Sequence, residues 1–188
     1  PVGFADNIDL YFGQDAVGSE TGNLARPYEA SATKVYSLAG WNRDGDFAYD
    51  VGVISLNQSL GDVLGHFGYW YGGGADAFNG TPVTTAGYPA RVADDTITTK
   101  RMYTDQGTIA SGTERNLYSF DYRASGGQSG SPVWDSDRKA VGVHSFSTDL
   151  DGDDRFDDRS GIVRFTDIQP FFNDLESDSQ FLVDRPDL

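Results

Sequence analysis

The sequence predicts an all-β protein, and three observations lead to this fold class. Short segments of alternating apolar and polar residues recur along the chain with turn residues between them, as in a β-barrel or sandwich. The chain has 23 Gly, 10 Tyr and 12 Phe in 188 residues, a composition that suits tight turns and half-buried strands. Its 38% of apolar residues is enough for a hydrophobic core.

Eight segments show the strand pattern. They are residues 8–12, 31–38, 49–56, 83–88, 96–103, 116–122, 140–146 and 161–165. In one of them Tyr118, Phe120 and Tyr122 recur with a period of two, which places the three rings on one face of a strand. We expect these rings to belong to the core rather than to a ligand site.

Two further segments differ from the strands. Residues 67–80 are rich in Gly and aromatic residues, which fits a connection that crosses between two domains. A helix is predicted to begin at Thr166 as the N-cap, with Asp167 in its first turn and Phe171 and Phe172 following. The residues after this helix are predicted to form a polar tail.

Charge and cysteine content exclude several classes of function. There are 29 acidic and 14 basic residues, a net charge of −15, so we expect neither nucleic acid nor an anionic membrane as a partner. The chain has no Cys, which excludes a disulfide, a thiolate nucleophile and a zinc–cysteine site. No apolar run reaches the roughly 20 residues needed to span a bilayer.

Acidic residues concentrate in residues 149–158, which hold six of the 25 Asp. Carboxylates at relative positions 1, 3, 5 and 9 can wrap one hard cation, and calcium is the natural candidate. Ser160 stands at position 12, where a helix-loop-helix calcium site has Glu, and a solvated acidic loop or salt adaptation is the alternative. The predicted ligands are Asp149, Asp151, Asp153 and Asp157. No organic cofactor is expected.

A loop at residues 126–133 has the composition of a nucleophile loop. Its sequence is Gly-Gly-Gln-Ser-Gly-Ser-Pro-Val, in which small residues bracket Ser129. They let the backbone turn tightly, so that the hydroxyl projects and neighbouring N–H groups converge, as a nucleophile with an oxyanion hole requires. An ordinary turn before a strand is the alternative.

Three segments in this order resemble the glutamyl endopeptidases, which are bacterial chymotrypsin-like serine proteases. Residues 49–54 resemble the family's segment around the triad aspartate, residues 126–133 its nucleophile loop, and residues 141–144 the strand that lines its specificity pocket. The resemblance covers roughly residues 5 to 175. It implies a chymotrypsin-like fold with two six-stranded β-barrels and a C-terminal helix, the first barrel being incomplete in this chain. The implied division is residues 1–66 for the later part of the N-terminal barrel, 67–80 for the crossing linker, 81–165 for the C-terminal barrel, and 166–188 for the helix and tail.

The resemblance also implies a set of catalytic residues. Ser129 becomes the nucleophile and Asp50 the carboxylate that orients an imidazole, while the N–H groups of Gly127 and Ser129 form the oxyanion hole. For Asp50 a capping or ion-paired aspartate at a strand start is the alternative.

Substrate specificity is assigned in the same way. His144 takes the place of the family's recognition element for an acidic side chain, with a histidine at the edge of the core as the alternative. Arg123, Ser125 and Ser145 complete the implied substrate-binding set. Arg123 either adds a second positive group to the pocket or points to solvent. The expected substrate is a peptide or protein with an acidic residue, Glu or Asp, before the scissile bond.

A catalytic histidine is not found among these residues. The chain has two His, and His66 follows Asp50 in the crossing segment, where a structural role is expected. We therefore expect an N-terminal fragment outside this chain to supply the imidazole of a secreted enzyme. The alternatives are an inactive protease homologue that binds peptides outside the cell and a calcium-binding β-domain of a surface protein.

Overall fold

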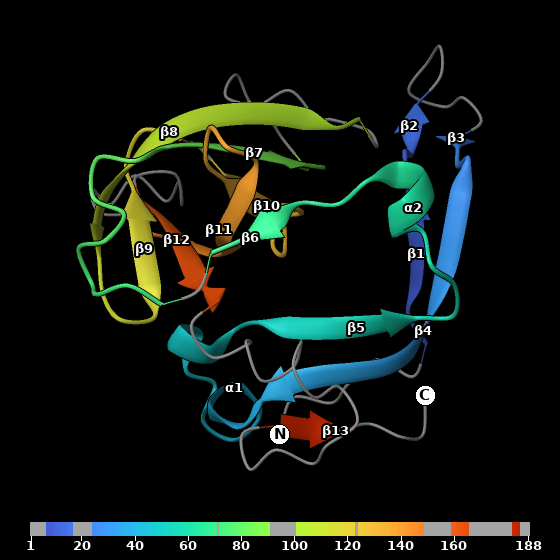
Figure 1. The fold of residues 1–188 in the computed structure, drawn as a ribbon, viewed down its shortest axis with the longest axis horizontal. Helices are drawn as coiled ribbons and strands as arrows, with labels where there is room; N and C mark the ends of the chain where they lie inside the picture. The colour runs from blue at the N-terminus through green and yellow to red at the C-terminus, as the bar shows by residue number, and fades with distance from the viewer. Residues whose placement is uncertain are drawn as a thin grey trace.

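The computed structural model describes residues 7–16, 24–70, 72–90, 101–122, 124–148, 159–165 and 182–184 (Figure 1). Two β-sheets dominate this part of the chain, which confirms the predicted all-β class. Among the described residues the longest helix, α1 (Ala39–Asp44), has six residues, and none is long and apolar enough to cross a membrane.

Six antiparallel strands close into a barrel. The ring runs β10–β7–β8–β9–β12–β11 and returns from β11 to β10. The strands are β7 (Pro82–Gly87), β8 (Tyr103–Gly112), β9 (Asn116–Ser119), β10 (Pro132–Trp134), β11 (Lys139–Thr148) and β12 (Arg159–Arg164). Outside the ring, the short β6 (Gly68–Tyr69) pairs in parallel with β11.

The barrel core receives one apolar side chain from each of the six strands. Each of them is at most 3% exposed: Val83, Ile109, Leu117, Val133, Val141 and Ile162. Burying a side chain of this size contributes about 1.5–3 kcal/mol to folding. In β7 the inward residues alternate with more exposed neighbours, which is the period of two on which the strand prediction rested.

The second sheet is built around a long, bent strand, β4 (Tyr28–Leu38). Its first residues pair with β1 (Asp9–Phe12), and after a register shift between Ala32 and Lys34 it pairs with β5 (Gly52–Leu56). Its end also pairs with β13 (Leu182–Asp184), so part of the segment predicted as a tail forms sheet (Figure 1). Among the described residues this sheet does not close into a ring. A separate hairpin joins β2 (Asp15–Ala16) and β3 (Leu24–Ala25).

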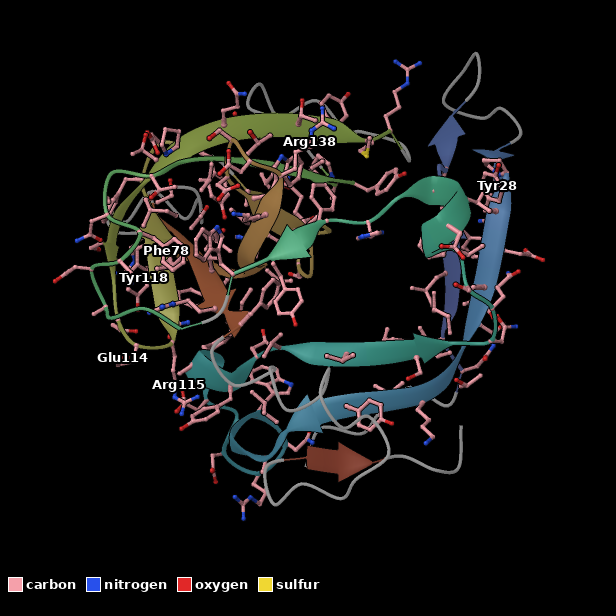
Figure 2. The ribbon with its side chains drawn as sticks, viewed as in Figure 1. Tyr28, Phe78, Glu114, Arg115, Tyr118 and Arg138 are labelled. Carbon is pink, nitrogen blue, oxygen red and sulfur yellow. The ribbon has the colours of Figure 1, made fainter. Side chains whose placement is uncertain are left out.

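The sheet meets the barrel through a short 3-10 helix, η1 (Phe47–Tyr49). The ring of Phe47 lies 5.2 Å from that of Phe146 on β11, and the Asn116 side chain donates to the Phe47 carbonyl at 3.4 Å. Arg115, labelled in Figure 2 where the barrel approaches the second sheet, stacks over the Tyr49 ring at 4.2 Å. These contacts dock the residues just before Asp50 on the barrel.

The connection between the sheets contains α2 (Gly61–Leu64) and β6, and one buried cation fixes its last part. Arg164 is 3% exposed, and its guanidinium donates to the carbonyls of Gly72, Gly73, Gly74 and Thr113 at 2.6–3.2 Å. The Arg164 guanidinium thus gives hydrogen bonds to the carbonyls of residues 72–74, which are not paired with a strand in the described part of the chain.

Not every predicted core ring is buried. Tyr122 is 1% exposed as expected, but Phe120 is 51% exposed, so the expectation that all three rings belong to the core was wrong. The cause is the face of β9 that turns inward: Leu117 and Ser119 are 0% exposed, so alternation places Tyr118 and Phe120 on the opposite face. The helix predicted from Thr166, Arg123 and the loop at 149–158 lie outside the described residues.

Candidate active site

Ser129 is exposed on a loop of two consecutive turns. In the first, the Gln128 N–H donates to the Ser125 carbonyl at 3.1 Å, and in the second, the Ser131 N–H donates to the Gln128 carbonyl at 2.9 Å. Gly127 and Gly130 have φ of +97° and +83°, the left-handed region that favours glycine. The glycines in the predicted nucleophile loop are therefore required by its backbone.

The loop rests against the end of β7. A Cβ added to Gly127 would lie 2.6 Å from the Tyr88 carbonyl oxygen, and the Ala90 N–H donates to the Gly126 carbonyl at 2.7 Å. This close approach leaves no room for a side chain at Gly127. The exposed hydroxyl therefore stands on a tightly supported backbone.

Strand β11 holds the other side of the loop and also holds Asp50. The Gly130 N–H donates to the His144 carbonyl at 2.8 Å, and the His144 N–H donates to the Ser131 carbonyl at 2.9 Å. The next residue, Ser145, donates its hydroxyl to Oδ2 of Asp50 at 2.5 Å. Since consecutive Cα atoms are about 3.8 Å apart, one short piece of strand fixes both groups.

Asp50 follows η1 directly, so the contacts of this helix fix its position. Asp46 caps this helix by accepting the Ala48 N–H at 2.9 Å, and the Tyr49 ring packs on Gly40, where an added Cβ would lie 2.5 Å from the ring. Among the described residues the Asp50 carboxylate accepts from Ser145 in the other sheet rather than from a neighbouring backbone group. This contact differs from the local cap that was the alternative interpretation.

His144 is buried and faces a tyrosine. Its ring is 4% exposed, with Nδ1 3.3 Å from the Tyr122 hydroxyl. Burial lowers the pKa of His144 from its ordinary 6.5 to about 4, so the ring is neutral at neutral pH. Burial also raises the pKa of the Tyr122 hydroxyl, which therefore keeps its proton. A neutral imidazole here has one N–H to offer.

The remaining predicted residues are distributed differently. Ser125 is half-buried and its N–H donates to Oε1 of Gln128 at 2.8 Å, while Ser145 contacts Asp50. His66 is exposed after α2, and within the described ranges no imidazole bonds to Asp50 or Ser129. Arg123 and the four predicted calcium ligands lie outside these ranges, which contain no group of three potential metal ligands. The sequence did not indicate roles for Gln128 and Tyr122, because the spacing of residues does not show which groups their side chains contact.

Comparisons with known proteins agree with this geometry. The model of the trypsin family matches residues 4–171. The chain is 35% identical over 127 residues to a glutamyl endopeptidase of Bacillus licheniformis, covering 66% of this chain and 37% of that protein. It is 34% identical over 120 residues to an extracellular metalloprotease of Bacillus subtilis, covering 61% and 36%. A solved Glu endopeptidase in complex with MPD has a TM-score of 0.62 at 21% identity, covering 79% of this chain and 64% of that one.

The matches therefore span less than two fifths of the length of both curated relatives. The structural likeness shows the chymotrypsin-like fold.

Proposed function

Since the chain belongs to the trypsin family of chymotrypsin-like serine proteases, we propose that it is a serine endopeptidase that cleaves peptide bonds after acidic residues. The observation that supports this most strongly is the double anchoring by β11. His144 holds the Ser129 loop through its backbone, and Ser145 holds Asp50 through its hydroxyl. A nucleophile and a carboxylate from different sheets are thereby kept at a fixed separation, as an imidazole between them requires.

In the proposed reaction Ser129 Oγ attacks the carbonyl carbon of the scissile bond while an imidazole takes the hydroxyl proton. The N–H groups of Gly127 and Ser129 donate to the oxyanion, since neither donates to another group among the described residues. As the intermediate collapses, the C–N bond breaks and the imidazolium gives its proton to the leaving amine. Water then attacks the ester, the imidazole takes its proton and returns it to Ser129 Oγ, and the acid product leaves.

The imidazole is proposed to come from a segment outside this chain. His144 is held by its own strand and faces Tyr122, and His66 is exposed in the connection after α2. The same segment would supply further strands to the open second sheet, whose edges are otherwise unpaired in the described part.

His144 is the proposed recognition group for the acidic side chain. If the Tyr122 hydroxyl donates to Nδ1, the ring carries its proton on Nε2, where it can donate to a substrate carboxylate. A carboxylate bound there would raise the pKa of the ring and strengthen the pair. Glu, and also Asp, is therefore the proposed residue before the scissile bond, with Arg123 and Ser125 as further pocket residues.

The enzyme is proposed to be secreted and to bind calcium. The name of the Bacillus subtilis relative describes an extracellular protein. The Asp-rich segment that would provide Asp149, Asp151, Asp153 and Asp157 connects Thr148 of β11 to its register partner Arg159 of β12. A bound ion would stabilise the native state, so EGTA should lower the Tm; an unchanged Tm contradicts the site.

A second candidate is an inactive homologue that binds acidic peptides, which the absence of an imidazole beside Asp50 in the described part favours. Intact mass under native and denaturing conditions separates the two, because the active enzyme should carry a fragment that contains histidine.

Specificity is tested with a peptide library. Cleavage should follow Glu or Asp and should persist in 1,10-phenanthroline, which would inhibit a metalloprotease. Cleavage only after Lys or Leu would contradict the role of His144.

A further inference from the structure

We propose that Gln128 is a positioning residue that holds the N–H groups of Gly127 and Ser129 in the orientation needed to bind the oxyanion. This inference rests on the proposed function, since it assigns a role in the same reaction. Gln128 itself touches no reacting atom in this account. It acts through the turn that precedes the nucleophile.

Gln128 closes the turn with two hydrogen bonds to Ser125, one through its backbone and one through its side chain. Its N–H donates to the Ser125 carbonyl at 3.1 Å, and its side-chain Oε1 accepts the Ser125 N–H at 2.8 Å. The two bonds form a small ring between residues 125 and 128, so that neither backbone group of Ser125 is left without a partner. A turn of this kind ordinarily has only the first of these bonds.

The turn needs the second bond because of its sequence. Its central residues are Gly126 and Gly127, and two consecutive glycines have more backbone freedom than any other pair. A Cβ added to Gly126 would have no atom within 4 Å, so packing does not restrain that residue. The peptide between the two glycines is held at its carbonyl by the Ala90 N–H at 2.7 Å, and a shift of the turn would move the Gly127 N–H away from the substrate.

The side chain of Gln128 fixes the start of the turn, because its Oε1 accepts the Ser125 N–H. It is 4% exposed, and its Cγ lies 3.3 Å from the Cβ position of Gly87 at the end of β7. Water therefore cannot easily replace Oε1 as the acceptor. Leaving a buried N–H without an acceptor costs about 1–3 kcal/mol, which is enough to shift a flexible turn to another conformation.

Gln128 also transmits its position to the nucleophile. Its carbonyl accepts the Ser131 N–H at 2.9 Å and so begins the second turn, in which Ser129 is the next residue. The two donors of the oxyanion hole thus flank Gln128 on either side. The side chain of Gln128 closes the first turn, and its backbone carbonyl closes the second.

Three variants test the proposal in whichever preparation hydrolyses an acidic peptide. Gln128→Met keeps the length of the side chain and removes the acceptor, and should lower kcat about 10- to 100-fold with KM changed less than threefold. Gln128→Glu keeps an acceptor oxygen in either protonation state and should restore most of kcat. Gln106→Met on β8, where Gln106 is exposed, is the matched control and should behave as the wild type.

A second readout does not depend on activity. Hydrogen exchange of the Ser125 amide should accelerate in Gln128→Met and stay slow in Gln128→Glu and Gln106→Met, with equal Tm values confirming that all variants fold. Wild-type kcat in Gln128→Met, or an equal loss in Gln106→Met, would overturn the positioning role. A wild type that hydrolyses no peptide would instead overturn the proposed function, while the exchange data would still report on the turn.

Discussion

At the residue scale, the bond from the Ser145 hydroxyl to Asp50 is the contact on which the site depends. It joins side chains 95 residues apart and holds a half-buried carboxylate in place. Hydrogen bonds to charged groups are worth about 1.5–3 kcal/mol, so part of this energy is available to orient the imidazole.

Ser145→Ala should therefore reduce kcat about tenfold, because the carboxylate loses a donor and its orientation loosens. Steady-state kinetics with an acidic peptide measure the effect. Ser147→Ala, two residues further along β11, is the matched control and should leave kcat unchanged. Equal kcat values for the two variants would contradict the role of Ser145.

His144 makes stability depend on pH. Its pKa is about 4 in the folded chain and near 6.5 when unfolded, so between these values the unfolded state binds a proton that the native state does not. Protonation of His144 therefore does not reduce the free energy of unfolding above pH 6.5. As the pH falls from 6.5 towards 4, this free energy decreases by up to about 3 kcal/mol.

The measurement is the free energy of unfolding in urea from pH 7.5 to 4 for the wild type and for His144→Gln. Carboxylates titrate in both proteins, so the difference between the two curves isolates the imidazole. The wild type should lose stability more steeply below pH 6.5. Parallel curves would mean that His144 is not held neutral.

At the scale of elements, the turns of the Ser129 loop can be predicted from the sequence, but the contacts that hold the loop in place cannot. Small residues and their order predict the turns, and the glycines at Gly127 and Gly130 confirm that reading. Strand β7 is predictable because its alternation extends over six residues. The three-residue β10 is too short for any pattern, although it closes the barrel.

Contacts between residues that are far apart in the sequence cannot be predicted from local patterns. The family resemblance placed Ser145 among the substrate-binding residues; in the structure its hydroxyl contacts Asp50, a partner 95 residues away that a local sequence pattern does not identify. The same holds for Gln128, whose role depends on a turn four residues long.

Gly127→Ala tests the loop as an element. The left-handed φ costs a residue with a side chain about 1–2 kcal/mol, and the new Cβ would lie 2.6 Å from the Tyr88 carbonyl oxygen. The loop must shift, so activity should fall at least 100-fold while the barrel remains folded. Gly126→Ala is the control, since it has open space, and should keep activity within a few fold. Similar activity in both variants would contradict the described backbone.

At the scale of the whole molecule, the barrel and the second sheet meet around Asp50, and Arg164 ties down the chain that joins them. Arg164→Leu removes the guanidinium from four carbonyls, of which Gly74 keeps the Ala77 N–H, and should reduce the free energy of unfolding by about 3 kcal/mol. Arg101→Leu at an exposed position is the control. Equal stability in urea would show that the connection is held by other contacts.

The net charge of −15 repels an acidic peptide, so the proposed substrate would have to be recognised by local contacts. The proposed acidic substrate would have to reach a neutral, buried imidazole in an acidic molecule. Salt should therefore assist binding by screening the repulsion.

Ser129 is proposed to be a nucleophile activated through an imidazole that Asp50 orients. The most direct measurement is the intact mass after reaction with a fluorophosphonate at pH 7.5, followed by mapping of the modified residue. One adduct, on Ser129, is expected in the preparation that carries the segment with the catalytic histidine, and no adduct is expected in Ser129→Ala. An unmodified Ser129 in that preparation, or an adduct that persists in Ser129→Ala, would contradict it.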